Sequence, residues 1–299
     1  MPMRKVRWED MFPDELFEEI QRNPVVYMAY GLAEPHGAYN ALGLDWLKAQ
    51  SLAEMAAQSH GGVVAPPFAW HIQERPEFHD DGHGHGWLVD SGVKQSLASA
   101  IPSALFYQMA LHQIRAFDAR GFRAAILITG HYGGPERILR LLCDFYTRRT
   151  GSPIRLHALA DWECIGLEDV QGDHAGITET SQLMALRPDL VDLDRKKVPR
   201  ELGERYAAGV SFDAGEPPPS RELGERIIQS QVVSLGKIQR GLLESYESLE
   251  GWTAPTSNDA DDIWHRFEQL TRKYWSPTYE EYRAGNVPEF PGWEALGEY

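Results

Sequence analysis

Short apolar runs that alternate with longer amphipathic segments constrain the fold of this chain more than any other feature. Each run has the length and composition of a buried strand. Strands that alternate with helices in this way form a mostly parallel sheet covered by helices on both faces. We therefore predict a three-layer α/β/α fold. The predicted strands are Val25–Tyr30, Val63–Ala65, Ala124–Thr129 and Ile154–Ala160.

The segments between these runs carry helical signals. We expect helices over residues 14–21, 46–59 and 103–120. A further helix is expected from Pro135, because proline suits the first position of a helix. Apolar residues follow at i, i+3, i+4 and i+7, which indicates one face turned toward the core. These residues are Ile138, Leu141, Leu142 and Phe145.

Side chains that bind metals follow two of the predicted strands. Glu34 and His36 come shortly after the first strand, and alternate residues of an extended segment point to the same side. Asp45 lies nine residues further on, and His131 follows a later strand. Because ligands bind beyond the carboxyl ends of parallel strands, these side chains should share one rim. Carboxylates and imidazoles bind zinc, manganese or iron(II), so a metal site is predicted there.

Three segments together resemble the creatininase (creatinine amidohydrolase) family. Its motifs are Glu-x-His with a downstream Leu-Gly-x-Asp, a glycine-rich Asn-Gly-His-Gly-Gly-Asn loop, and His-Ala-Gly-x-x-Glu-Thr-Ser. This chain has all three in order over roughly residues 20–190. They read Glu34-Pro35-His36 with Leu42-Gly43-Leu44-Asp45, then Gly130-His131-Tyr132-Gly133-Gly134, then His174-Ala175-Gly176-Ile177-Thr178-Glu179-Thr180-Ser181.

The resemblance implies a creatininase-like fold with two divalent metal ions per chain, zinc, manganese or iron(II). One ion would be held by Glu34, Asp45 and His131. The other would be held by His36, Asp45 and Glu179, so that Asp45 bridges the two. Two such ions bind a bridging water, lower its pKa and polarise a carbonyl group.

The last of these ligands departs from creatininase itself. That enzyme takes a ligand Glu two residues after the His of the glycine loop, where this chain has Gly133. Glu136 is near in the sequence but starts a helix, whereas Glu179 belongs to the third motif. We favour Glu179 as the fifth ligand.

The third motif also supplies the expected proton donor, His174, because the family places a general acid there and a His titrates near neutral pH. Asp173 either orients His174 or caps the helix that follows. Tyr132 either contacts substrate or packs in the core. Gly133 and its neighbouring glycines allow close approach of the backbone, whose amides then donate to a developing oxyanion.

Residues 66–90 do not follow the family pattern, because a Pro-Gly-Thr segment is missing and Trp and His are abundant instead. Trp70, His71 and Glu74 offer a flat face, donors and an acceptor for a polar cyclic substrate. His83 and His85 either bind a third metal or belong to a surface loop. Thr129 and Pro135 also replace family asparagines, so the substrate need not be creatinine.

These observations favour a metal-dependent hydrolase that opens a cyclic substrate by attack of metal-bound hydroxide on a carbonyl, with cleavage of a C–N bond. The resemblance leaves one alternative reaction, the C–C cleavage of a cyclic diketone derived from inositol or another cyclitol. A protein of another class, a non-catalytic assembly stabilised by metal, is the second alternative. Against it, structural zinc sites tend to be rich in sulfur, and Cys143 and Cys164 lie near none of the motifs.

The last third of the chain has a different character. We divide the sequence into a hydrolase core over residues 1–195 and a helical extension over residues 196–299, packed on the core or on a neighbouring subunit. A long helix is expected over 221–250, followed by an aromatic tail that wraps a surface over 252–299. Both features suggest a homo-oligomer, and the family makes a hexamer possible.

Bulk properties exclude some partners. The net charge of −15 disfavours nucleic acid and anionic membranes, since no basic stripe offsets phosphate repulsion. No run approaches the roughly 18 apolar residues of a membrane span. The two cysteines form no disulfide framework, and no signal peptide is recognised, so a cytoplasmic location is expected.

Overall fold

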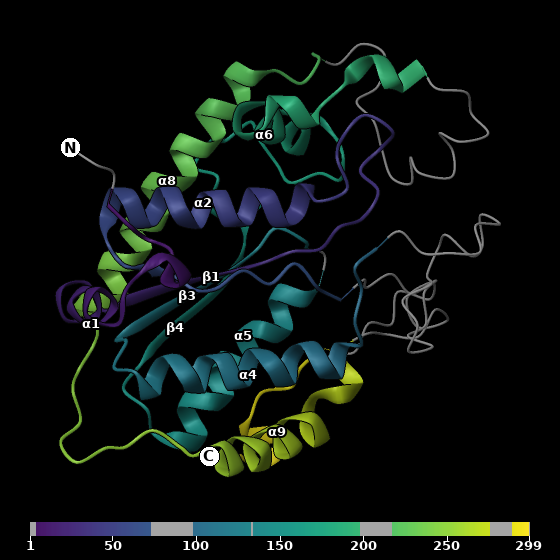
Figure 1. Cartoon of the computed structure of the whole chain (residues 1–299). Helices are drawn as coiled ribbons and strands as arrows, with labels where there is room; N and C mark the ends of the chain where they lie inside the picture. The colour runs from purple at the N-terminus through teal and green to yellow at the C-terminus, as the bar shows by residue number, and fades with distance from the viewer. Residues whose placement is uncertain (1–3, 73–97, 133, 198–216, 276–288, 299) are drawn as a thin grey trace.

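A parallel sheet lies between two layers of helices in the computed structural model of this chain (Figure 1), which describes residues 4–72, 98–132, 134–197, 217–275 and 289–298. The sheet has the order β2-β1-β3-β4, and its strands are β1 (Val25–Tyr30), β2 (Val63–Val64), β3 (Ala124–Thr129) and β4 (Arg155–Ala160). All three pairings are parallel. The predicted three-layer fold is therefore confirmed.

The chain reverses its direction of travel across the sheet between β1 and β3. From β1 it crosses to β2 on one side, and β3 then pairs on the other side of β1, in register from Val25 with Ala124 to Tyr30 with Thr129. Ligands of open α/β sheets bind at such a switch point, beyond the carboxyl ends of the strands. The loops that carry Glu34 and His131 begin at this point, after β1 and β3.

One face of the sheet is covered by α2 (Leu44–His60), α6 (Ile177–Leu186) and α8 (Arg221–Glu244), as Figure 1 shows. Alanines of α2 pack directly on the strands, which brings this helix close to the sheet. The apolar side of α8 is buried in the same cluster by residues of the same chain. Its core residues are Ile227, Ile228, Val232 and Leu235.

The other face is covered by α4 (Ser103–Ala119) and α5 (Pro135–Thr150), with α9 (Ser257–Thr271) packed outside them. The predicted stripe of α5 lies in this larger core. Aromatic side chains from the end of the chain close the same core, with Trp264, Trp275 and Trp293 all buried. The helix α1 (Pro13–Arg22) precedes β1. Short 3₁₀ helices span Trp8–Asp10, Asp161–Cys164, Pro188–Leu190, Leu193–Lys197, Arg272–Tyr274 and Glu294–Leu296.

The C-terminal third differs from the prediction in two respects. Helix α8 ends at Glu244, short of residue 250, and its buried side faces α2 and α6. This helix therefore gives no reason to expect a partner subunit, and the oligomer stays a prediction. The tail also contains α9, whose start is fixed by reciprocal hydrogen bonds between Thr256 and Asp259. In the part of the chain that the structure describes, no helix is both long and apolar enough to cross a bilayer.

Two glycines let the first turn of α2 approach the ends of the central strands. A Cβ added to Gly31, after β1, would lie 2.5 Å from the backbone nitrogen of Trp46. A Cβ added to Gly130, after β3, would lie 2.8 Å from the carbonyl carbon of Asp45 and closer still to its oxygen. Both glycines therefore place the backbone of Asp45 against the rim of the sheet.

Candidate metal centre

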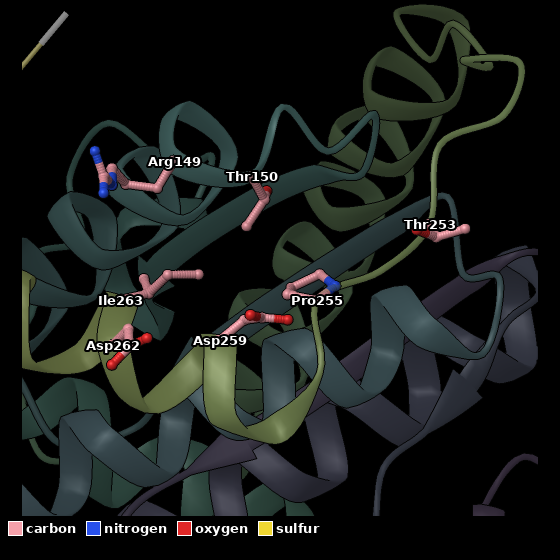
Figure 2. A pocket seen from close by; sticks show the side chains of 7 residues that line it. All are labelled: Arg149, Thr150, Thr253, Pro255, Asp259, Asp262 and Ile263. Atoms are coloured by element: carbon pink, nitrogen blue, oxygen red, sulfur yellow. The ribbon is translucent and has the colours of Figure 1, made fainter.

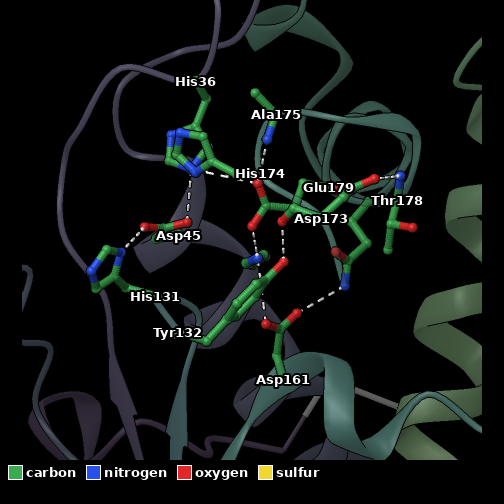
Figure 3. A network of polar contacts seen from close by, with 12 residues as sticks. His36, Asp45, His131, Tyr132, Asp161, Asp173, His174, Ala175, Thr178 and Glu179 are labelled. Atoms are coloured by element: carbon green, nitrogen blue, oxygen red, sulfur yellow. Dashed lines mark hydrogen bonds and ion pairs between the residues drawn. The ribbon is translucent and has the colours of Figure 1, made fainter. Parts of the chain in front are cut away.

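Five ligand-type side chains meet at the switch point, and they are the five that the sequence predicted as metal ligands. Figure 3 shows four of them, His36, Asp45, His131 and Glu179. Glu34 and His36 come from the loop after β1, Asp45 from the first turn of α2, His131 from the loop after β3 and Glu179 from the first turn of α6. Their ligand atoms form two compact groups, one of Glu34, Asp45 and His131 and another of His36, Asp45 and Glu179, and a third group joins Glu34 and His36 with His174. Four of the five are buried and His131 is partly exposed.

Asp45 belongs to the first two of these groups, and its two oxygens face different partners. Its Oδ1 lies 3.0 Å from Nε2 of His36, and its Oδ2 lies 3.2 Å from Nδ1 of His131. The same His131 nitrogen lies 3.0 Å from Oε1 of Glu34, which completes the first group. A carboxylate with its oxygens divided in this way has the geometry of a bridge between two cations.

The ring of His36 is held in the orientation that a metal ligand needs. Its Nδ1 lies 3.0 Å from the backbone oxygen of Glu34, to which it donates, so Nε2 is the ring nitrogen that faces the cluster and could bind a cation once deprotonated. Glu179 approaches the same Nε2 with one oxygen, Oε2, at 3.6 Å. That oxygen also accepts the backbone N–H of Ala175 at 2.8 Å.

Glu136, the alternative to Glu179 as fifth ligand, makes its hydrogen bond outside the cluster. Its carboxylate accepts the N–H of Gly134 at 3.1 Å, at the start of α5. Glu179 is the one of the two that joins the cluster. The preference for Glu179 therefore agrees with the geometry.

The three buried carboxylates of Glu34, Asp45 and Glu179 give the cluster a strongly negative electrostatic environment. Burial by itself would lower the pKa of His36, but the charge of Asp45 and then that of Glu179 raise it to about 9. Burial would likewise lower the pKa of His131, yet Glu34 and Asp45 raise it to about 10. The imidazoles thus take up protons to balance the carboxylates, and a divalent cation can replace those protons.

His174 borders the cluster. Its Nδ1 lies 3.9 Å from Oε1 of Glu34, and its ring centre lies 4.5 Å from that of His36. Its Nε2 is buried and has no hydrogen-bond partner among the described residues. Burial, and after it the charge of His36, lowers the pKa of His174.

Asp173 takes the second of the two roles considered for it. Its two oxygens accept the backbone N–H groups of Thr178 at 2.7 Å and Glu179 at 3.1 Å, in the first turn of α6. Asp173 therefore caps the helix that carries Glu179, and its two oxygens accept from this helix and not from His174. Ala175, between Asp173 and the start of α6, has φ of 56°, a left-handed conformation that bends the chain sharply at this motif.

The glycine loop differs from its predicted role. The N–H of Gly130 donates to the carbonyl of Tyr30, and that of Gly134 donates to Glu136. These two amides are therefore not free to stabilise an oxyanion, and Gly133 lies outside the described residues. The hydroxyl of Tyr132 donates to the backbone oxygen of Asp173, so its packing role is the one observed.

The predicted substrate segment is only partly described. His71 is fully buried, with Nδ1 accepting from the N–H of Ile72 and Nε2 lying 3.1 Å from Oγ1 of Thr129. Both ring nitrogens are thus used within the protein, and the expected contact of His71 with substrate is not supported. Trp70 is half exposed and can still offer its ring. Glu74, His83 and His85 lie outside the described residues.

Two site features were absent from the predicted set. Lys48, one turn after Asp45 on α2, and Asp161, directly after β4, are buried beside Glu179. Their positions in the sequence could have indicated a role in the site. Lys48 is a charged residue on the buried face of α2, and Asp161 is a carboxylate at a strand end, as Glu34 is. Trp162 is partly exposed and packs edge-on against Tyr132, with ring centres 6.4 Å apart.

A separate hollow of about 320 Å³ lies between the end of α5 and the start of α9 (Figure 2). Its walls mix charges of both signs, and it shares no residue with the cluster. The lining residues are Arg149, Thr150, Thr253, Pro255, Asp259, Asp262 and Ile263.

Comparison with known proteins decides the family. A profile of the creatininase family, described as creatinine amidohydrolase, matches residues 9–235. This chain belongs to the creatininase family. The match includes all five clustered side chains and extends into α8, beyond the motifs that first suggested it.

The named and solved family members compared with this chain are distant relatives. The creatinine amidohydrolase of Pseudomonas putida is 24% identical over 187 residues, which is 57% of this chain and 67% of that protein. Two solved creatininases, a variant of Zn-Zn type and a manganese form, each superpose with a TM-score of 0.63 at 22% identity. Each comparison covers 80% of this chain and 98% of the other. These structures support the creatininase fold.

Proposed function

We propose that this protein is a divalent-metal-dependent amidohydrolase that opens a small, polar, cyclic substrate by hydrolysis of a C–N bond. The division of the Asp45 oxygens between His36 and His131 carries this proposal, because it matches the bridging ligand of a two-metal site. Membership of a family of amidohydrolases supports the reaction type. The comparisons offer nothing in favour of the C–C cleavage of a cyclitol-derived diketone.

The residues fit two divalent ions. Glu34, Asp45 and His131 would hold one, and His36, Asp45 and Glu179 the other. Buried carboxylates are costly without a counter-charge. Here the carboxylates raise the pKa of two imidazoles, so that the imidazoles carry protons that balance the negative charge, and a cation can displace those protons. Zinc, manganese and iron(II) all accept this mixture of imidazole and carboxylate ligands. When bound, such ions lower the pKa of a water molecule and polarise a carbonyl group.

His174 is the residue we assign to the leaving nitrogen. Its Nε2 lacks a partner among the described residues and is buried beside the cluster, so it can hold a proton for a group bound there. Its neighbour Asp173 fixes the start of α6 and so the place from which Glu179 enters the site. The left-handed turn at Ala175 lies between His174 and the start of α6.

Metal content tests the centre before any substrate is known. Protein stripped with a chelator and reloaded with zinc or manganese should retain about two ions per chain after dialysis. Glu179→Gln should lose one ion, whereas the matched variant Glu136→Gln should keep both, because Glu136 only contacts the start of α5. One ion or none in the reloaded wild type, or equal metal content in both variants, would contradict the ligand assignment.

Turnover tests the reaction. The reloaded protein, offered a panel of cyclic amides including creatinine, should release the ring-opened product, and the chelated protein should not. His174→Gln should keep both ions and lose roughly 10²–10⁴-fold in turnover, the usual scale for a general acid or base. Metal loss in that variant would make His174 a ligand. Failure of the metal-loaded protein on every C–N substrate, with activity on a cyclic diketone, would replace the proposed reaction.

A further inference from the structure

Lys48 is a buried lysine next to the metal centre. It lies on α2 one turn after Asp45, and its side chain is 1% exposed. Its ammonium contacts Oε1 of Glu179 and lies 3.3 Å from Oδ1 of Asp161. It also lies 4.6 Å from the centre of the Tyr132 ring, over its face. Burying an ammonium group is costly, and these contacts with two carboxylates and an aromatic face compensate for that cost.

The far side of this ion pair is anchored to the helices of the same layer. Oδ2 of Asp161 accepts from Nε2 of Gln182 on α6 at 3.1 Å. Gln231 on α8 donates from Nε2 to the backbone oxygen of Asp161 at 2.8 Å, and its own Oε1 accepts from Gln182 at 3.1 Å. Asp161, Gln182 and Gln231 are all buried. The carboxylate of Asp161 that contacts Lys48 is therefore fixed by a hydrogen-bond network that joins its own 3₁₀ helix with α6 and α8.

The two oxygens of Glu179 consequently have different surroundings. Oε1 is turned toward Lys48, away from the cluster. Oε2 accepts the N–H of Ala175 and lies 3.6 Å from Nε2 of His36. Figure 3 shows Glu179 with Ala175 and His36 beside its carboxylate. Oε2 is therefore the oxygen that lies toward His36 and that would face an ion bound with His36 and Asp45.

We propose that Lys48 is a positioning residue of the metal centre, which occupies one oxygen of Glu179 so that this ligand presents only the other. The proposal rests on the proposed function, because it assumes an ion between His36, Asp45 and Glu179. The charge of Lys48 is matched by that of Asp161, so the pair adds no net charge to the site. Its specific effect is to fix the orientation of a ligand.

A charge-neutral pair of substitutions separates position from charge. The double variant Lys48→Met with Asp161→Asn removes both charges and the donor to Glu179, and the net charge of the network stays at zero. A partner outside the ligand shell usually changes metal affinity by roughly 10–100-fold. We expect one of the two ions to bind 10–100-fold more weakly, with the ion held by Glu34 and His131 unaffected.

The matched control is Lys48→Gln with Asp161→Asn, which has the same net charge and restores a donor at position 48. It should recover most of the lost affinity. Affinities are compared by zinc titration of chelated proteins that retain the circular dichroism of the wild type. Cobalt(II) absorption provides a second readout, since its bands report the coordination of each ion. The methionine variant should alter the bands of one ion, and the glutamine variant should leave them close to those of the wild type.

Each outcome decides the role of Lys48. If the methionine variant binds both ions as tightly as the wild type, or more tightly, the positioning role is refuted. If the methionine variant does not fold, the glutamine variant decides, because loss of an ion from it would also refute the role. A wild type that binds fewer than two ions would refute the proposed metal centre itself, and that result is visible before any variant is made.

Discussion

Substitution of Gly130 by alanine tests whether backbone contact sets the position of the bridging ligand. The new Cβ would lie 2.8 Å from the carbonyl carbon of Asp45, where an ordinary contact begins at 3.4 Å, and the overlap with the carbonyl oxygen is larger. Both contacting atoms are backbone, so no side chain can turn aside. Either the loop after β3 or the first turn of α2 has to move.

The expected cost follows from this overlap. Overpacking in a core usually costs about 1–3 kcal/mol, and a clash with backbone belongs at the upper end of that range. For a chain of 299 residues, 1 kcal/mol corresponds to roughly 1.5–2 °C in melting temperature. We therefore expect Gly130→Ala to lower the melting temperature of the chelated protein by about 4–6 °C. Because Asp45 and His131 flank the clash, the variant should also hold fewer than two ions.

The control is Gly241→Ala, in the last turns of α8, where an added Cβ meets no atom within 4 Å. Alanine favours a helix over glycine, so this variant should gain up to roughly 0.5–1 kcal/mol and keep both ions. Thermal unfolding in chelator and metal analysis of the reloaded proteins measure both effects. A Gly130→Ala protein with the melting temperature and metal content of the wild type would refute the reasoning.

The other predictions concern the metal centre directly. Asp45→Ala should lose both ions, because each of its oxygens faces a different group, whereas His131→Ala should mainly weaken one; equal metal loss in the two variants would remove the bridge. The metal-free protein should lose stability as pH rises from about 6.5 to about 10. The pKa values of His36 and His131 are raised in the folded state to about 9 and about 10, so their contribution is complete below the unfolded value and is lost above the folded ones. The increase in melting temperature produced by zinc should therefore grow over this range, and an increase that shrinks would contradict the argument.

The strands of the sheet and the shared rim of Glu34, His36 and His131 could be predicted from local pattern and topology, whereas Asp45 and Glu179 were added as ligands by the family resemblance. An apolar run of strand length predicts a buried strand, and parallel strands bring their carboxyl ends to one edge. That rule places Glu34 beside His131 without any knowledge of side-chain contacts. Glu179 could be chosen over Glu136 because it belongs to the third motif of the resemblance, whereas Glu136 starts the helix after Pro135.

Other parts of the site depend on contacts between segments far apart in the sequence. Nothing near Lys48 in the sequence shows that Asp161 and Glu179 surround it. His71 was expected at the substrate because it is a polar residue in an irregular loop, yet the fold buries it behind Thr129. Helix α9 was missed because the aromatic and proline content of the tail outweighed the capping pair Thr256 and Asp259.

The close approach of α2 to the sheet has a consequence for how an enzyme of this kind can change. Gly31 and Gly130 bring the ends of β1 and β3 against the backbone of Asp45, and the carboxylate of Asp45 contacts His36 and His131. Residues such as Trp70 and Trp162, which are partly exposed, can therefore be replaced without moving the bridging carboxylate. A laboratory library that varies these exposed side chains while keeping both glycines should yield altered substrate preferences on an unchanged metal centre.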